Sequence, residues 1–439
     1  MSKFYILVVV FVLSGVMPAF ALDLVQTYEL GLQNDPQLRA SRAAKNSTRE
    51  TRTQALAQLL PSFSAGGGIK RTHENIRGVK FNFGGIGDDD TYEQTGLALS
   101  LSQPIYRKDY WIQLQQSSNL IAQAEAAHVA EEQALVMRIA QAYFNVLTAQ
   151  DMLGFTRAEK AAIQRQLDQA QQSFDAGLIA ITDVYEAQAA LDNSMANEIQ
   201  AENELDDAWE ALHVIIGDTE KALALLTSNL PLNMPEPQDI DQWSETARQQ
   251  NPILVALRSA TAVARQNIQL QQSAHHPTLE LVGSHALDRT AARGRRDSDV
   301  SSIGLQLNIP IYSGGGVTSR VRQAQYNFER SRENLDKQRR VVKQQVRDAY
   351  RGVVSSISRG KALKATTISA KSALDATEAG FEVGTRTMVD VLAEQRNLYR
   401  ARRDYSHVRY EYILNGLRLK LAAGSLSQGD LASVNAWLK

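Results

Sequence analysis

The chain has 439 residues, of which 47 are basic and 48 are acidic, so its net charge is −1, and it contains no cysteine. The absence of cysteine excludes a disulfide framework and thiolate metal sites. The balanced charge argues against bulk attraction to nucleic acid, so no nucleic-acid partner is expected.

The first residues have the pattern of a secretory signal. Lys3 supplies a positive start, an apolar run follows over 4–17, and an A-x-A cleavage sequence ends at Ala21. The pattern predicts a signal peptide over 1–21, with cleavage before Leu22. The alternative, an N-terminal membrane anchor, is disfavoured because the apolar run is shorter than the roughly 20 residues that a span needs. No later segment is apolar enough to predict a transmembrane helix.

Helix and strand patterns alternate after the signal. Residues 24–59 predict helix, with one break at Asp35-Pro36, because proline fits a first helical turn. Two strands are expected over 61–103, and the second alternates leucines at 97, 99 and 101 with small residues. The segment 73–90 is rich in Gly, Asp and Arg and predicts a solvated hairpin loop, as does 288–299 in the second half.

A long helical hairpin is predicted next, over 111–216. Residues 111–176 contain no proline and one glycine, so they predict one helix of about 66 residues, or roughly 100 Å at 1.5 Å per residue. Gly177 ends it, and a second helix of about half that length is expected over 181–216. The apolar positions are spaced close to heptads, which is typical of coiled-coil packing.

The second half of the chain repeats the first at a fixed offset. Gly177 corresponds to Gly384 and Asp183 to Asp390, since 384 minus 177 and 390 minus 183 both equal 207. So long a period indicates a duplicated structural unit rather than a solenoid. The predicted divisions are a first repeat over 22–217, an equatorial linker over 218–240, a second repeat over 241–424 with strands over 277–310 and a helical hairpin over 316–423, and a C-terminal tail over 425–439.

The strands predict a membrane barrel shared between chains. An apolar face opposite a small or polar face is typical of outer-membrane strands, and such a face contacts lipid. A β-sandwich alternates similarly, but only four strands are predicted and long helices flank each pair. Four strands cannot close a barrel, and open edges are not tolerated in hydrocarbon. Two chains would give eight strands and a filled interior, whereas three give twelve and leave a lumen, so we predict a homotrimer.

These features resemble the TolC-like outer-membrane factors, the exit ducts of Gram-negative efflux pumps and type I secretion systems. The resemblance covers essentially the whole mature chain. It implies an α+β membrane protein, a homotrimer with a 12-stranded β-barrel and a helical periplasmic tunnel, located in the outer membrane. It also implies two protein partners, a periplasmic adaptor (membrane fusion protein) and an inner-membrane transporter of the RND, ABC or MFS type. It rests on the duplication, on the strand ends Gln103-Pro104-Ile105-Tyr106 and Ile309-Pro310-Ile311-Tyr312, and on the turn motifs over 174–184 and 381–392.

The turn motifs supply the candidate site, a gate at the periplasmic tip. The resemblance implies constricting links at Asp183 and Arg386 and an acidic ring at Asp390. Phe381 stands where the best-known members have a tyrosine, and Ala393 where they have a second aspartate, so fewer polar links are expected here. Thr182 is assigned to the same gate, and the residues expected to dock the adaptor are Gly177, Leu178, Gly384 and Thr385.

A simpler interpretation of the same residues stays open. Asp183 and Asp390 each lie in the first turn of a predicted helix, where a carboxylate complements the positive helix end and contributes about 0.3–1 kcal/mol. Arg386 is then a solvated turn residue. Exposed ion pairs are individually weak, so only a ring of them is expected to hold a closed state.

No other motif predicts chemistry. His275-His276 precedes Pro277 and is assigned to a helix C-terminus, and Asp88-Asp89-Asp90 to a solvated loop. No enzyme, cofactor or metal site is predicted. The predicted function is a passive exit duct for small molecules or unfolded protein, in multidrug efflux or type I secretion. The alternatives are a stand-alone outer-membrane porin, which leaves the helices unexplained, and a periplasmic coiled-coil scaffold, which leaves the strands unexplained.

Overall fold

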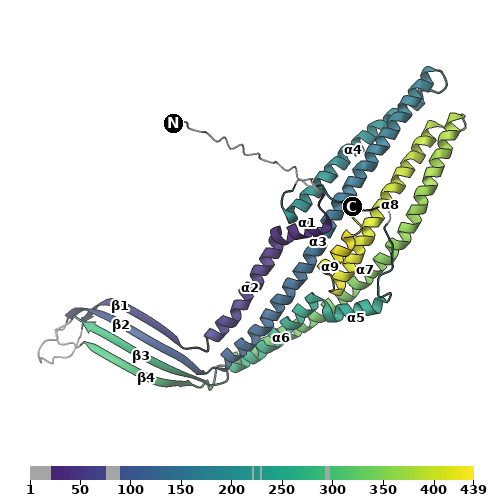
Figure 1. Cartoon of the computed structure of the whole chain (residues 1–439). Helices are drawn as coiled ribbons and strands as arrows, with labels where there is room; N and C mark the ends of the chain where they lie inside the picture. Colours follow the sequence, from purple (N-terminus) through teal and green to yellow (C-terminus); the bar gives the residue numbers. More distant parts are fainter. Residues whose placement is uncertain (1–20, 76–88, 220–221, 228–229, 292–296) are drawn as a thin grey trace, which may run out of the picture. The chain divides into compact units, whose positions relative to one another are not determined.

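The computed structural model describes residues 21–75, 89–219, 222–227, 230–291 and 297–439 (Figure 1). Apart from Ala21, the predicted signal peptide lies outside these residues, as does Asp88. The elements in chain order are α1 (Leu24–Asn34), α2 (Pro36–Ala57), β1 (Ser62–Asn75), β2 (Asp89–Tyr106), α3 (Lys108–Asp175), α4 (Ile181–Ile216), α5 (Ile240–Gln250), α6 (Pro252–Ser273), β3 (Thr278–Thr290), β4 (Ser298–Asn308), α7 (Gly316–Glu382), α8 (Met388–Ala423) and α9 (Gln428–Asn435).

Two compact units divide the chain. The helical unit comprises Met1–Leu38, Glu132–Ala247 and Gln344–Lys439, and the sheet unit comprises Arg39–Glu131 and Arg248–Lys343. Each unit combines segments from both sequence repeats, because the continuous helices α3 and α7 contribute to both. A sequence repeat is therefore not a packing unit of this fold.

The helical prediction for the start of the chain is confirmed, including its break. Asp35 lies between α1 and α2, and its carboxylate accepts hydrogen bonds from the N–H groups of Gln37 (2.6 Å) and Leu38 (3.1 Å). It also pairs with Arg138 at 2.6 Å. Burial acts to raise the pKa of Asp35, but the hydrogen bonds from Arg138 and Leu38 and the charge of Arg138 outweigh it, and the pKa is lowered. In the second repeat Asn251 caps α6 in the same way.

The long helices have the predicted lengths. Helix α3 spans 68 residues without a break and α7 spans 67, while α4 and α8 have 36 residues each. Within the described residues, no helix is long and apolar enough to span a membrane.

The sheet unit contains one antiparallel sheet in the order β1-β2-β3-β4. The β2–β3 pairing joins the two repeats, with Ser100 opposite Ser284. Both loop predictions were too long, because β1 reaches Asn75 and β3 reaches Thr290. Cross-strand bonds extend the ladder into this polar sequence, and the His73 ring is 2.9 Å from the Thr91 hydroxyl.

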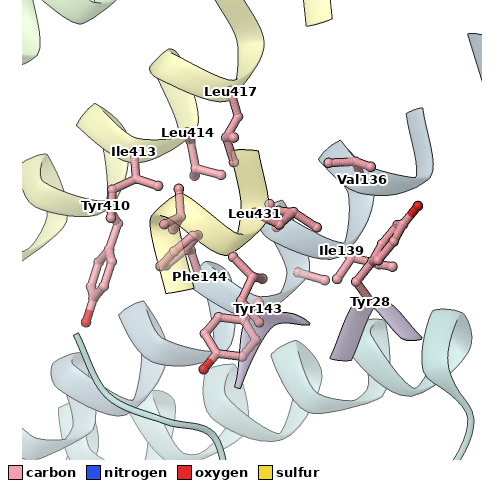
Figure 2. Close-up of a cluster of buried hydrophobic side chains, with 14 of the residues drawn as sticks. Tyr28, Val136, Ile139, Tyr143, Phe144, Tyr410, Ile413, Leu414, Leu417 and Leu431 are labelled. Carbon is pink, nitrogen blue, oxygen red and sulfur yellow. The ribbon is translucent and has the colours of Figure 1, made fainter. Parts of the chain in front are cut away.

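The main core of the helical unit takes buried side chains from α1, α2, α3, α4, α7, α8 and α9, and part of it is shown in Figure 2. Tyr143 and Phe144 of α3 are fully buried and meet edge to face, with ring centroids 5.5 Å apart. Tyr28 of α1, Tyr410 of α8 and Leu431 of α9 belong to the same cluster. Each buried apolar side chain of this size contributes about 1.5–3 kcal/mol, so the cluster holds the hairpins together at this level.

Leu22, the predicted first residue after cleavage, belongs to this core. Its N–H donates to the Ala222 carbonyl (2.6 Å), and its carbonyl accepts from the Ala224 N–H (2.9 Å) and the Tyr143 hydroxyl (3.1 Å). Burial raises the pKa of Tyr143, so its hydroxyl stays a donor. Ala21 is exposed, and cleavage between it and Leu22 stays a prediction.

The predicted tail contains structure that its sequence did not indicate. Helix α9 begins with a capping box in which Ser427 and Asp430 bond each other. Beyond it, Lys439 exchanges two backbone hydrogen bonds of 2.9 Å with Leu225. Leu431 of α9 is fully buried, so tertiary contacts hold this short helix in place.

Candidate functional site: two hairpin turns and one sheet

The first hairpin turn, between α3 and α4, closes on a left-handed glycine. Gly177 has φ +74°, and its N–H donates to the Phe174 carbonyl at 2.8 Å. The Leu178 N–H reaches the Ser173 carbonyl at 2.9 Å, and its side chain is 77% exposed. Helix α4 begins at Ile181 with no side-chain cap, because Ala180 occupies the N-cap. The backbone therefore closes this turn and leaves an apolar side chain at its surface.

The second turn, between α7 and α8, has the same backbone and a different cap. Gly384 has φ +75°, and its N–H donates to the Phe381 carbonyl at 3.0 Å. Here Thr387 is the N-cap. Its N–H donates to Asp390 Oδ2 at 3.0 Å, while the Asp390 N–H donates to Thr387 Oγ1 at 3.3 Å. This capping box stabilises the start of α8.

The two predicted gate aspartates therefore differ. The N–H and hydroxyl of Thr387 and the charge of Arg386 lower the pKa of Asp390. Asp183 is half-buried, and its N–H donates to the Ala180 carbonyl at 3.1 Å. No ion pair within the part of one chain that the structure describes joins Asp183 to Arg386. Asp390 therefore caps α8, and the gate role of both aspartates stays a prediction.

Phe381 lies in apolar surroundings rather than in a polar network. It packs against a cluster in which Val184 of α4 meets Met388 of α8. It also contacts a second cluster that contains Val391. The ring therefore lies between two parts of the tip core, where a phenol would need a partner for its hydroxyl. Thr182, by contrast, is exposed on the first turn of α4.

Gly380 positions Arg386, which the sequence did not indicate. The Gly380 carbonyl accepts hydrogen bonds from the N–H groups of Thr385 (2.8 Å) and Arg386 (3.2 Å). A Cβ at Gly380 would lie 2.7 Å from Cγ of Arg386, so the arginine stem passes directly over this glycine. The only available signal was a second glycine four residues before Gly384 in the turn motif.

A buried carboxylate inside the helical layer was also missed. Glu159 of α3 is 8% exposed and lies 3.6 Å from Arg403 of α8. Burial raises the pKa of Glu159, and the charges of Arg403, Arg396 and Arg400 oppose that rise. The periodic arginines of α8 were a usable signal, because they place one basic face against α3.

The sheet presents two chemically distinct faces, as predicted. Four serines, one per strand, lie in adjacent register positions on one face, with hydroxyl distances of 2.8 Å for Ser64–Ser100 and for Ser284–Ser302. The opposite face is apolar and open, and Ile303 on it is 75% exposed. Strands β1 and β4 are the edges of the sheet. The exposed apolar side chains of this sheet include Phe63, Leu97, Leu99, Ile303, Leu305 and Leu307.

Among the residues whose placement is described, no group of three or more His, Asp or Glu side chains is arranged to hold a metal ion. The ring of His276 contacts Lys108 Nζ at 3.1 Å.

Long antiparallel helices joined to a four-stranded sheet with one apolar face define an outer-membrane channel subunit. The model of the family described as outer membrane efflux protein matches residues 27–218 and 243–425, one match in each repeat. The chain belongs to this family. It is an outer-membrane exit duct.

Relatives and solved structures agree with this assignment. The chain is 38% identical over 427 residues to the outer membrane protein TolC of Vibrio cholerae, covering 96% of this chain and 94% of that protein. It is 30% identical to the proteases secretion protein PrtF of Dickeya chrysanthemi, covering 100% and 95%. Its fold is similar to that of the CmeC outer membrane channel of Campylobacter jejuni, with a TM-score of 0.79 at 17% identity over 94% of this chain and 88% of that one.

Proposed function

We propose that three copies of this chain form one duct with a 12-stranded barrel and a helical periplasmic tunnel. The sheet with two open edges and an exposed apolar face is the observation that supports this. Unpaired backbone groups are not tolerated in hydrocarbon, so both edges need strands from other copies. Three sheets give a barrel wide enough for a lumen, and the serine row then faces water while the face around Ile303 contacts lipid.

The trimer is tested in outer-membrane fractions of cells that express the full chain. The expected result is a heat-labile band of three times the chain mass on gels run without boiling, which collapses to the monomer when boiled. A monomer recovered from the soluble periplasmic fraction would instead support a coiled-coil scaffold.

We propose that the duct is closed at rest by the two hairpin turns. Asp183 of one copy lies close to Arg386 of another, and Asp390, held by Thr387, adds a fixed acidic ring. Adaptor docking at the exposed turn residues then separates the links. The docking residues are Gly177, Leu178, Gly384 and Thr385, and the partners are a periplasmic adaptor and an inner-membrane transporter.

The family description and one relative support the proposed cargo. The family is described as outer membrane efflux protein, and PrtF is named for proteases secretion. We propose that this duct conducts unfolded protein or small molecules passively, and that the transporter selects between them. The proposal requires no catalytic group or cofactor.

Conductance in planar bilayers tests the gate. Wild-type trimers are expected to show low conductance, which separates a gated duct from an open porin. Replacing Arg386 with Gln removes the cationic partner of every link and is expected to raise the open time severalfold. Arg332→Gln, the same change on an exposed part of α7, is the matched control and is expected to leave the channel closed. An Arg386→Gln channel as closed as wild type would rule out this gate.

A further inference from the structure

A pocket lies in the helical unit, bordered mainly by the predicted linker, α5, α8 and α9. Its volume of about 450 Å³ is within the range of roughly 300–1,000 Å³ that is typical of small-molecule sites. All of its lining residues belong to the helical unit. On α8 the lining begins at Tyr412, which is 28 residues after Gly384 (412 − 384 = 28), or roughly 40 Å at 1.5 Å per residue. The pocket is therefore separate from the proposed gate.

A glycine on α8 leaves this pocket open. Tyr412, Gly416 and Lys420 line it from one face of α8, because residues four apart are neighbours on a helix. Nothing lies within 4 Å of a Cβ built on Gly416. In the first repeat the position 207 residues earlier is Trp209, whose side chain packs against the main core. The second repeat therefore has open space where the first repeat has an indole ring.

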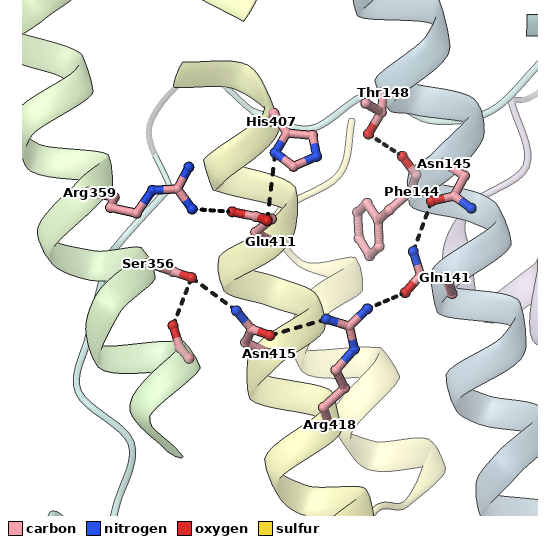
Figure 3. A network of polar contacts seen from close by, with 11 residues as sticks. Gln141, Phe144, Asn145, Thr148, Ser356, Arg359, His407, Glu411, Asn415 and Arg418 are labelled. Atoms are coloured by element: carbon pink, nitrogen blue, oxygen red, sulfur yellow. Dashed lines mark hydrogen bonds and ion pairs between the residues drawn. The ribbon is translucent and has the colours of Figure 1, made fainter. Parts of the chain in front are cut away.

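Hydrogen bonds hold the walls of the pocket in place. The Tyr412 hydroxyl accepts from the Asn233 N–H and donates to the Asn233 carbonyl, both at 3.0 Å. The Trp243 indole N–H donates to the Pro237 carbonyl at 2.8 Å. Asn415, the residue before the pocket glycine, belongs to the polar network that joins α8 to α7 and α3 (Figure 3). Because these groups are already ordered, a ligand would lose little affinity to the ordering of its site.

Aromatic rings and one uncompensated carboxylate determine the chemistry of the lining. Lys420, the one basic side chain among the described lining residues, pairs with Asp430 at 2.5 Å. Glu236 also lines the pocket, is exposed, and forms no ion pair with any described residue. The lining therefore has a net charge of −1. Its aromatic side chains are Trp243, Tyr412 and Trp437.

From these observations we infer that the pocket binds a flat organic cation. Indole and phenol rings attract a cation that lies over their faces, and the carboxylate of Glu236 adds the opposite charge. An anion would be repelled by Glu236 and would gain little from Lys420, since Asp430 already neutralises that ammonium. One chain supplies the whole lining, so the inference depends on neither the trimer nor the gate.

Equilibrium dialysis of the purified full chain in an uncharged detergent tests the site. The probe is N-methylacridinium, and acridine in mildly alkaline buffer has the same three rings without the charge. The cation is expected to bind once per chain and about tenfold more tightly than acridine, because cation–π attraction and the carboxylate add to the apolar contact. Micelles without protein give the blank for probe that enters detergent. Equal binding of the two probes, or tighter binding of anthracene sulfonate, would overturn the inference.

Filling the pocket tests its location. Gly416→Trp introduces the residue that the first repeat has and is expected to lower the affinity for N-methylacridinium at least tenfold. Gly154→Trp is the matched control, because Gly154 is a glycine of α3 that also has nothing within 4 Å of a built Cβ and does not line the pocket. It is expected to bind the cation like wild type. A Gly416→Trp chain that kept the wild-type affinity would show that the cation binds elsewhere, and the inference would be wrong.

Removing the carboxylate tests the selectivity for charge in a variant that changes no buried group. Glu236→Gln is expected to lower the affinity for N-methylacridinium about threefold to fivefold and to leave that for acridine unchanged, as for an exposed ion pair. Glu210→Gln makes the same change at an exposed acid of α4 outside the pocket and is expected to alter neither affinity. A Glu236→Gln chain that bound both probes like wild type would contradict the inferred role of this carboxylate, even if Gly416→Trp failed to fold.

Discussion

The two hairpin turns have the same backbone conformation but different side chains. The glycines have φ values of +74° and +75°, and each turn closes through equivalent N–H donors. Where the first turn has Ala180, the second has Thr387, 207 residues later. The two repeats therefore share the glycine that closes the turn and differ in the cap. The second turn is therefore capped by its own aspartate, whereas the first turn has no side-chain cap.

Truncating the apolar side chain at the start of α8 or α4 is expected to give the largest difference in stability between the two turns. Met388 is fully buried in the tip core, whereas its counterpart Ile181 is 39% exposed. Met388→Ala is expected to cost about 2–5 kcal/mol of local stability, because it opens a cavity where α4 and α8 meet. Ile181→Ala is expected to cost well under half as much. Hydrogen exchange of the first two turns of α8 and α4 measures both changes. Equal losses would show that the two turns depend on the same core.

Replacing the turn glycine by Ala is expected to give the next largest loss of stability, and the loss should be the same at both turns. Nothing lies within 4 Å of a Cβ built on Gly177 or Gly384, so Gly→Ala adds no clash. The cost is then conformational, about 1–2 kcal/mol at each turn, because a side chain disfavours the left-handed backbone. Exchange of the turn amides checks it. Unequal costs would mean that the shared backbone is supported differently in the two repeats.

The N-cap has a smaller effect on stability, and one substitution removes it from the second turn while another introduces it in the first. Thr387→Ala is expected to destabilise the start of α8 by about 1 kcal/mol, since it leaves an N-terminal amide without an acceptor. Ala180→Thr places the same cap before Asp183 and is expected to stabilise α4 by a similar or smaller amount. Hydrogen exchange of the first-turn amides of α8 and α4 measures both changes. If Ala180→Thr left α4 unchanged, the missing hydroxyl would not explain why the first turn is uncapped.

Most of the fold was predictable because its patterns are long. A helix of 68 residues needs only an unbroken sequence, and the break at Asp35-Pro36 is a local signal of proline and cap. The ends of the strands were not predictable in the same way. His73 and Thr91 look like loop residues until a cross-strand bond pairs them. Helix α9 is eight residues long and depends on the burial of Leu431 rather than on propensity.

The candidate site was predictable in part, for a related reason. Glycines that require a left-handed backbone can be recognised from sequence, and so can an aspartate in a first helical turn. The Phe381 ring and the Arg386 stem could not be placed, because each meets residues that only the folded turn brings near. Gly380 lies under Arg386 because the chain reverses between them, and no periodicity signals that contact.

Acidification is expected to give the smallest difference in stability between the two turns. The capping box determines that acid destabilises the start of α8. The pKa of Asp390 is lowered in the folded turn, so its contribution is fully present above the ordinary pKa of about 4 and is lost as pH falls through the lower folded value. Below pH 4, the amides at the start of α8 are therefore expected to lose protection, measured as their exchange relative to the intrinsic rate at the same pH. Asp390→Asn should exchange faster at neutral pH and show less acid dependence, because an amide accepts a weaker hydrogen bond than a carboxylate. If the acid response of α8 survived in Asp390→Asn, another group would be titrating at this turn, and the capping box would not be what separates the two hairpins.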